Sequence, residues 1–326
     1  PVNRGFDHFF GTACCPTTDW LYAFIDGDRI PVPPTAVVDK SKLPGHWYAR
    51  DCRGGMIAPG FDLEEIDMIF LRRSEAFLGK HVKENPKKPF FLLHSCQAVH
   101  LPSFPGKDFH GKTKAGPHGD FIFQFDAVVG RLMEKLKQLG VAENTLVMVS
   151  SDNGPELPTV QDMRKTYGHD GARPWRGMKR DNWEGGHRVP FIVRWHGAVK
   201  PGSTSTQTVN LTDVMATCAE IVGHKLPRDA AEDSVSFLPV LSGEIPDWEL
   251  DGETITRTFL FADFAAAMGF VTSVAVAAEA ADHHPDIAVS WNRVTLSLST
   301  HSAGALTSLD RDLAQRIDGL ASPSAD

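Results

Sequence analysis

The chain has 326 residues, a mass of 35.7 kDa and a formal net charge of −8 at pH 7. The negative charge and the absence of a lysine or arginine run argue against nucleic acid as a partner. A hydrophobic fraction of 42% is ordinary for a globular protein, so the chain can bury a sizeable core. Five cysteines lack the spacing of a metal or redox motif and leave the compartment open: Cys14, Cys15, Cys52, Cys96 and Cys218.

No targeting or membrane segment is evident. The sequence as given starts at Pro1 without a basic or apolar leader, so no signal peptide is visible and a cytoplasmic location is favoured. The best membrane candidate, Phe264 to Ala278, is shorter than the roughly 20 apolar residues that span a bilayer. We interpret it as a buried, alanine-rich helix of a soluble protein and expect no membrane partner.

Residues 1 to about 60 are rich in proline and glycine, which predicts long ordered loops. Two amphipathic helices are then predicted. The first covers Asp62 to Val82, with Ile66 and Phe70 on its apolar face behind an acidic first turn, and the second covers Phe121 to Leu139.

Three apolar runs predict strands. Pro89 to Ser95 is continuous, as in a strand buried on both faces, and Thr145 to Gly154 and Val189 to Trp195 are similar. Strands that alternate with helices indicate an α/β domain with a largely parallel sheet and helices on both faces.

The pattern changes near Ser242 to Pro246. The segment "DWELDGETITRTFLF" alternates around Asp251-Gly252, which is typical of a β-hairpin. Asp263 is predicted to cap a helix. The apolar face of that helix is predicted from a regular spacing and consists of Phe264, Met268, Val271 and Ala275.

Alternation returns in Val289 to Thr300, with Val294, Leu296 and Leu298 on one face. A closing helix carries Leu309, Leu313, Ile317 and Leu320. Together these elements predict a second domain, an α+β unit of roughly 80 residues with an antiparallel sheet and helices on one face.

Polar side chains follow the predicted strands of the first domain. His100, Asp152 and Asn153 come just after strands, where open α/β sheets gather ligands. The carboxylate and amide oxygens of Asp152 and Asn153 suit a hard cation such as Ca²⁺. By itself, "DNG" is more typical of a turn than of a metal site.

Four longer motifs, one of which contains "DNG", favour the metal site over the turn. "GFDHFFG", "PFFLLHSCQAVHLP", "SSDNGPE" and "RGMKRDNWEGGHRVPF" resemble, in order and spacing, the arylsulfatase family, and the likeness covers about Pro1 to Gly243. The resemblance implies an alkaline-phosphatase-like fold and sulfuric ester hydrolysis. It implies that Asp152 and Asn153 are calcium ligands, that Lys179 holds the sulfate, and that His100 assists the leaving group.

The chain also departs from that family. The family's nucleophile is a cysteine in the motif C-x-P-S-R, matured to formylglycine and located upstream of the segment that matches "GFDHFFG". Neither this motif nor the paired aspartates that complete the calcium site is present in the sequence as given. "CCPTT", Cys14 to Thr18, mimics the pattern but has threonine in place of arginine and lies downstream. We interpret the sulfatase-like portion as truncated and expect it to be inactive, with calcium at most at an incomplete site.

Three histidines lie close together near the C-terminus, in "ADHHPD" and "STHSAG". Their simplest interpretation is a helix cap and a surface turn. However, the pattern of Glu279, His283, His284, Trp291 and His301 resembles pterin-4a-carbinolamine dehydratase, and the likeness runs from about Ile245 to Leu320.

This resemblance implies dehydration of 4a-hydroxytetrahydrobiopterin without a metal. His283, His284 and His301 would line the pterin pocket as general acid and base, since histidine titrates near neutrality, and which is acid and which is base stays open. Glu279, Trp291 and Asp310 are the supporting pterin-binding candidates. Ile287 stands where the family usually has a large aromatic residue.

The sequence therefore predicts a fusion of a truncated sulfatase-like domain, 1–243, with a dehydratase-like domain, 244–326. The dehydratase, a hydro-lyase acting on a small pterin, is the preferred function. Hydrolysis of a sulfate ester is the alternative. A third hypothesis is an oligomerisation module, with a homo-oligomer formed through the C-terminal domain.

Overall fold

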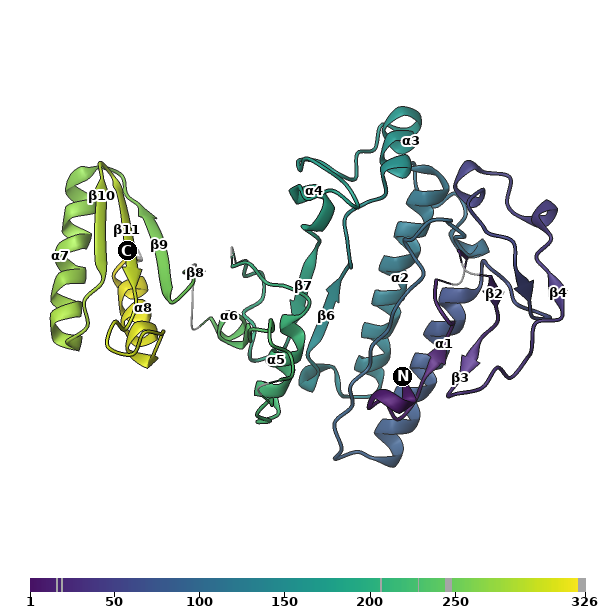
Figure 1. The fold of residues 1–326 in the computed structure, drawn as a ribbon, viewed down its shortest axis with the longest axis horizontal. Helices are drawn as coiled ribbons and strands as arrows, with labels where there is room; N and C mark the ends of the chain where they lie inside the picture. Colours follow the sequence, from purple (N-terminus) through teal and green to yellow (C-terminus); the bar gives the residue numbers. More distant parts are fainter. Residues whose placement is uncertain (16, 19, 206, 228, 244–247, 322–326) are drawn as a thin grey trace. The chain divides into compact units, whose positions relative to one another are not determined.

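The computed structural model describes the chain except for residues 16, 19, 206, 228, 244–247 and 322–326. The chain forms two compact units, Pro1–Ile192 and Val193–Asp326 (Figure 1). The domain boundary between residues 243 and 244 stays a prediction, and residues 244 and 245 of that junction lie outside the described residues.

Two long helices form the centre of the first unit. Helix α1, Ile66–Glu84, and helix α2, Gly116–Gln138, both confirm predicted helices, and they contact each other. Leu78 of α1 and Leu136 of α2 are buried in one cluster with Ala142. Burial of such side chains is worth about 1.5–3 kcal/mol each, which is why the amphipathic faces meet.

Strands β1 to β7 are short and form small sheets. Strands β1 and β3 pair antiparallel, β5 pairs with β2 in parallel and with β4 antiparallel, and β6 pairs with β7. Strands β6 and β7 confirm two of the predicted strands. The strand bounds are Phe10–Gly11, Leu21–Tyr22, Ile25–Asp26, Ala36–Val37, Met56–Ile57, Val147–Ser150 and Phe191–Arg194 for β1 to β7.

Short helices complete this unit. Helix α3, Leu157–Tyr167, and helix α4, Glu184–His187, follow β6. Among the residues described, 3₁₀ turns lie before or between the other elements, at Val2–Arg4, Lys40–Lys42, Trp47–Ala49, Lys107–Phe109 and Ala142–Asn144. The first 60 or so residues are thus mainly loops that carry very short strands, as predicted.

The strand predicted at Pro89 to Ser95 is wrong. These residues form no strand, and the segment is not buried on both faces, because Phe91 is 61% exposed and Leu93 is 68% exposed. Phe90 and Leu92 pack against the cluster around Leu78 instead. A strand also needs a neighbouring strand to pair its backbone N–H and C=O groups, and this run has no such pairing among the described residues.

The second unit contains a four-stranded antiparallel sheet in the order β10-β11-β9-β8. Strands β8, Glu249–Asp251, and β9, Thr254–Leu260, form the predicted hairpin, with Gly252 at a positive φ of 60° in its turn. Helices α5 and α6, Asp213–Ile221 and Leu238–Ser242, precede the sheet.

Strand β10 was missed. The alternation expected from Val289 to Thr300 is broken at Trp291, whose φ is 52°, and the chain turns there between β10, Asp286–Ser290, and β11, Arg293–Leu298. All five residues of β10 are exposed, so the strand has no buried face that its apolar pattern could reveal. β11 itself keeps the predicted inward face.

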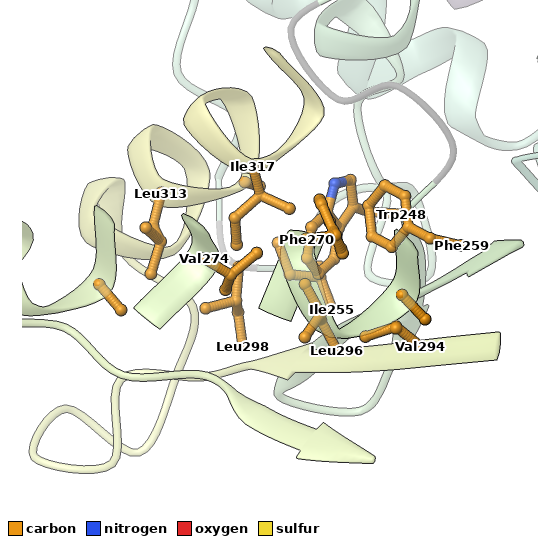
Figure 2. Close-up of a cluster of buried hydrophobic side chains, with 13 residues drawn as sticks. Trp248, Ile255, Phe259, Phe270, Val274, Val294, Leu296, Leu298, Leu313 and Ile317 are labelled. Carbon is orange, nitrogen blue, oxygen red and sulfur yellow. The ribbon is translucent and has the colours of Figure 1, made fainter. Parts of the chain in front are cut away.

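Two helices, α7 at Phe264–Ala281 and α8 at Ser308–Ala321, cover one face of this sheet. Figure 2 shows side chains of both helices and of the sheet meeting in one core. The opposite face is polar: Thr256 Oγ1 lies 3.0 Å from Ser297 Oγ, and Thr258 Oγ1 lies 2.9 Å from Thr295 Oγ1. The predicted α+β architecture, with helices on one face, is confirmed.

The buried face of α7 differs from the predicted one. The residues that face the core are Ala267, Phe270, Val274 and Ala278, whereas Phe264 is 51% exposed. α7 is apolar nearly all round, with a mean hydropathy of 1.6, so spacing alone could not choose a face. Of the described helices, α7 is the one that is long and apolar enough, by length and composition, to cross a membrane, and 22% of it is buried. The predicted cap is confirmed, because Asp263 Oδ1 accepts a hydrogen bond from Ala266 N at 2.8 Å.

Candidate functional site

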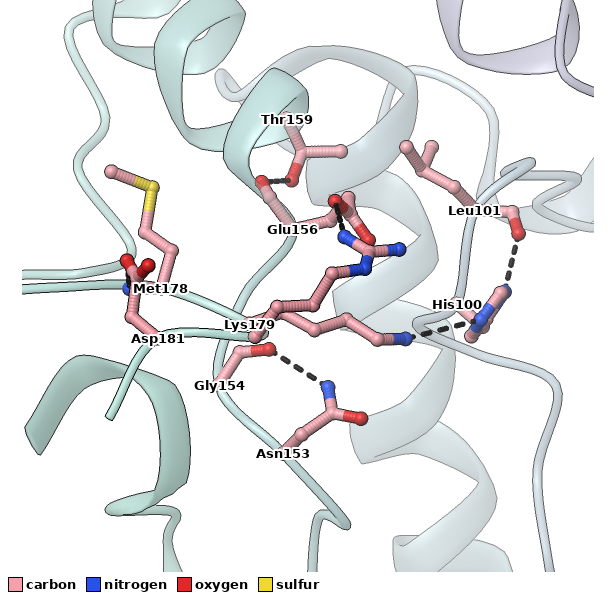
Figure 3. Close-up of polar contacts among 10 residues, drawn as sticks. His100, Leu101, Asn153, Gly154, Glu156, Thr159, Met178, Lys179 and Asp181 are labelled. Carbon is pink, nitrogen blue, oxygen red and sulfur yellow. Dashed lines mark hydrogen bonds and ion pairs between the residues drawn. The ribbon is translucent and has the colours of Figure 1, made fainter. Parts of the chain in front are cut away.

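The end of β6 places Asp152 and Asn153 in the polar turn expected from the sequence. Asp152 is exposed and Asn153 is half-buried. The Asn153 amide nitrogen donates to the Gly154 carbonyl at 2.8 Å (Figure 3). The amide oxygen is therefore the atom of this side chain that can act as a ligand.

The turn is locked to the segment that carries Lys179. Gly154 N donates to the Gly186 carbonyl at 2.8 Å, and Lys179 N donates to the Pro155 carbonyl at 2.9 Å. A side chain at position 154 would put its Cβ 1.8 Å from the Gly185 carbonyl oxygen, so only glycine fits there. These backbone contacts hold Lys179 beside the end of β6.

The structure brings Lys179 and His100 together. Lys179 Nζ lies 3.4 Å from His100 Nε2, and His100 Nδ1 contacts the Leu101 carbonyl on its other side (Figure 3). An ammonium group can only donate, so Nε2 accepts and the proton of the neutral ring lies on Nδ1. A hydrogen bond with Cys15 raises the pKa of His100, while burial and the neighbouring Lys179 charge oppose the rise.

The residue that sequence reasoning missed is Cys15. Its Sγ lies 3.5 Å from His100 Nδ1. Burial raises the pKa of the Cys15 thiol, but hydrogen bonds with His100, Thr18 and the Thr17 backbone outweigh burial and lower it to about 6. The signal in the sequence is "CCPTT", which resembles the nucleophile motif only in part.

The described residues do not form a complete calcium site. They contain no group of three or more histidine, cysteine, aspartate or glutamate side chains placed to hold a metal ion. Asp152 and Asn153 offer oxygen atoms of the right chemistry, but Ca²⁺ takes six to eight oxygen ligands. These two residues can hold the ion only if other groups or water supply the rest.

In the second unit, a buried carboxylate organises the histidine region. Asp310, near the start of α8, is 1% exposed, and its Oδ1 lies 2.8 Å from His283 Nε2. Its Oδ2 accepts from Thr300 Oγ1 and from Thr307 N, both at 2.7 Å. Burial raises the pKa of Asp310, but the hydrogen bonds with Thr300, Thr307 and His283 outweigh burial and lower it below its ordinary value.

His284 and His301 flank this carboxylate. Each is the chain neighbour of a residue bonded to Asp310, since His284 follows His283 and His301 follows Thr300. Both are exposed, and His284 Nε2 lies 3.1 Å from Glu279 Oε2. The two segments that carry the three histidines are therefore tied together with two rings facing solvent.

Trp291 lies elsewhere in this unit. It is 68% exposed at the turn between β10 and β11, whereas the histidines lie at the other end of that hairpin. At about 3.3 Å per residue, the five residues of β10 separate the two ends by about 17 Å. Within one chain Trp291 is not beside the histidines, and its role in pterin binding stays a prediction. Ile287, on β10, is 39% exposed.

Comparison with known proteins identifies both portions. A family model described as sulfatase matches residues 2–224, which is more than half of the chain. The chain belongs to the sulfatase family. A second family model, described as pterin 4 alpha carbinolamine dehydratase, matches residues 227–320. The predicted fusion of a sulfatase domain with a pterin dehydratase domain is confirmed.

Individual relatives are similar to each of the two portions. An N-acetylgalactosamine-6-O-sulfatase of Bacteroides thetaiotaomicron is 36% identical over 247 residues, 75% of this chain and 46% of that protein. A solved structure from work on glycosaminoglycan metabolism by the same organism covers 77% of this chain and 61% of its own, with 24% identity and a TM-score of 0.59, and supports the fold. A transcriptional coactivator/pterin dehydratase from Brucella melitensis is 43% identical over 23% of this chain and 82% of its own, with a TM-score of 0.23.

The chain spans less than half the length of the curated sulfatases it matches. Its sulfatase domain therefore corresponds to one part of those proteins, and their activities do not transfer to it directly.

Proposed function

We propose that the C-terminal domain dehydrates 4a-hydroxytetrahydrobiopterin by general acid and base catalysis. The reaction needs one proton delivered to the departing hydroxyl group and one removed from ring N5. Imidazole groups suit both steps at neutral pH and need no metal.

The buried Asp310 network is the observation that supports this proposal most. A carboxylate that accepts from His283 and Thr300 fixes the two histidine segments against each other. With Nε2–H of His283 donating to the carboxylate, Nδ1 keeps its lone pair and the ring orientation is set, as for the carboxylate of a catalytic triad. His284 and His301 are exposed beside this fixed ring, where a ligand can reach them.

Alanine substitutions in the full chain test the proposal. Replacing His283, His284 or His301 removes a proton-transfer group, so dehydratase activity should fall by roughly 10²- to 10⁴-fold for each. His81→Ala, on α1 of the other unit, is the matched control and should leave the rate unchanged. Rates that survive all three substitutions, in proteins that melt normally, would sink the catalytic assignment.

A chelator provides a second test of the same mechanism. Since only side-chain protons are used, the dehydration rate should be the same before and after treatment with excess EDTA. Loss of the activity with EDTA, and its return with a divalent cation, would contradict a metal-free mechanism.

Hydrolysis of a sulfate ester is the second candidate function. It is favoured by the 3.4 Å contact of His100 and Lys179, which places a cation and a proton-transfer group at one anion site. A sulfated amino sugar is the substrate class to test first, given the 36% identical relative. The calcium ligands would be Asp152 and Asn153.

For the 326 residues expressed as they stand, we expect no turnover of an aryl sulfate. The sequence as given contains no C-x-P-S-R motif, and loss of a covalent catalyst costs many orders of magnitude. Sulfate release in proportion to enzyme, abolished by Lys179→Ala, would reverse this expectation.

A further inference from the structure

Cys15 lies in a cluster with His100 and Lys179 of the proposed sulfate site, but neither proposed reaction uses its thiol. The cluster consists of the Cys15 thiol, the His100 ring and the Lys179 ammonium group, in that order, joined by distances of 3.5 and 3.4 Å. The three residues come from three separate loops of the first unit. The His100 ring beside the thiol stabilises a negative charge on sulfur, and Lys179 adds a positive charge on the other side of that ring.

A buried network fixes the geometry of this cluster. Thr17, next but one to Cys15, is fully buried, and its Oγ1 accepts from Gln97 Nε2 at 3.1 Å. Gln97, three residues before His100, also donates its backbone N–H to Asp67 Oδ1 at 2.7 Å. Asp67 accepts a further bond from Ala98 N at 3.0 Å. The loop with the thiol and the loop with the imidazole are thereby held to each other and to α1.

The sulfur is also accessible. Cys15 is half-buried, so a small molecule can reach it, whereas Cys52 is buried. Burial raises the pKa of Cys52, Cys96 and Cys218, which keeps these thiols protonated and slow to react.

We propose that Cys15 is a nucleophilic thiol and a covalent modification site for small electrophiles, with those that carry a negative charge favoured. With a haloacetate, the thiolate sulfur attacks the methylene carbon, a C–S bond forms, the carbon–halogen bond breaks, and halide leaves with the electron pair. With a hydroperoxide, sulfur attacks one oxygen, the O–O bond breaks, and the leaving oxygen takes a proton. Sulfur is thereby oxidised to a sulfenic acid as the peroxide is reduced.

The modification would also block the anion site formed by His100 and Lys179. An adduct on Cys15 stands against His100 and removes the charge that the imidazole balances. This consequence depends on the sulfatase domain alone, so the dehydratase proposal can fail without affecting it, and the reverse is also true.

The pH profile of alkylation is the first test. The full reduced chain is treated with iodoacetamide between pH 5 and 9, and intact mass follows the number of adducts. We expect one fast thiol whose rate rises through about pH 6 and is flat near pH 7.5. The fast phase should vanish in Cys15→Ser and persist in Cys14→Ser, which alters the exposed neighbour. A fast phase that survives Cys15→Ser would overturn the proposal, as would a rate that climbs to about pH 8.5 like that of a free thiol.

The second test measures charge selection at pH 7.5. We expect Lys179→Ala to lower the rate of iodoacetate labelling several-fold relative to iodoacetamide, and added salt to shrink the difference. Lys83→Ala, an exposed lysine on α1, should leave the ratio unchanged. His100→Gln should move the midpoint of the pH profile upward. Equal ratios in wild type and Lys179→Ala would show that the cluster does not direct anions to the sulfur.

Discussion

Single residues carry the chemistry of both domains, and several of their contacts are invisible in the sequence. The family resemblance indicates His100 and Lys179 but not Cys15, because "CCPTT" matches the nucleophile motif only in part. Cys15 meets His100 across 85 positions of the chain. No local pattern encodes such a contact, since it depends on how distant loops pack. Trp291 illustrates the reverse case, because a residue near the histidines in sequence lies at the far end of a hairpin.

Asp310 gives a prediction at this scale. Its pKa is lowered in the folded chain, so it contributes stability above the unfolded value of about 3.9, and this contribution is lost as the pH falls through the folded value. Asp310→Ala should cost about 1–3 kcal/mol at pH 7, because it leaves the buried donors of His283 and Thr300 without their acceptor. Urea unfolding of wild type and variant from pH 7 to 3 should show the difference shrinking below about pH 4. A constant difference across that range would contradict the linkage.

At the level of elements, hydrophobic periodicity predicted those helices and strands that have one buried and one exposed face. The apolar faces of α1, α2 and β11 were all predicted. The predicted ends of the two helices lie within five residues of the observed ones, whereas the strand expected at Val289 to Thr300 is confirmed only for Arg293–Leu298. The run at Pro89 to Ser95 is apolar without being a strand, because strand formation requires partners that a sequence does not show. For α7 the sequence predicted the helix and its cap but not its buried face, since the surface of the helix is apolar nearly all round.

The cap of α7 can be tested directly. Asp263→Ala removes the acceptor of the Ala266 N–H and should destabilise the C-terminal domain by about 0.5–2 kcal/mol. Asp263→Asn, which keeps a capping oxygen, should lose much less. Thermal unfolding of the two variants separates capping from charge, and an equal loss in both would show that the charge of Asp263 matters instead.

On the scale of the whole molecule, each described hydrophobic cluster lies within one unit. The cluster in Figure 2 is built only from residues between Trp248 and Ile317, and the cluster around Leu78 lies entirely in the first unit. We therefore expect core substitutions to act on one unit at a time. Leu296→Ala should lower the free energy of unfolding of the second unit by about 2–5 kcal/mol and shift only its calorimetric transition. Leu78→Ala should do the same for the first unit. If both variants shift a single common transition, the units unfold together.

The glycines beside Lys179 limit which substitutions this fold tolerates. Positions 154, 185 and 186 each face a backbone carbonyl so closely that an added Cβ would lie 1.8 to 2.1 Å from its oxygen. A library randomised at the three positions should return glycine at all of them, whatever activity is selected. Variation that reshapes the anion site has to come from its other borders, the loops that carry Cys15 and His100.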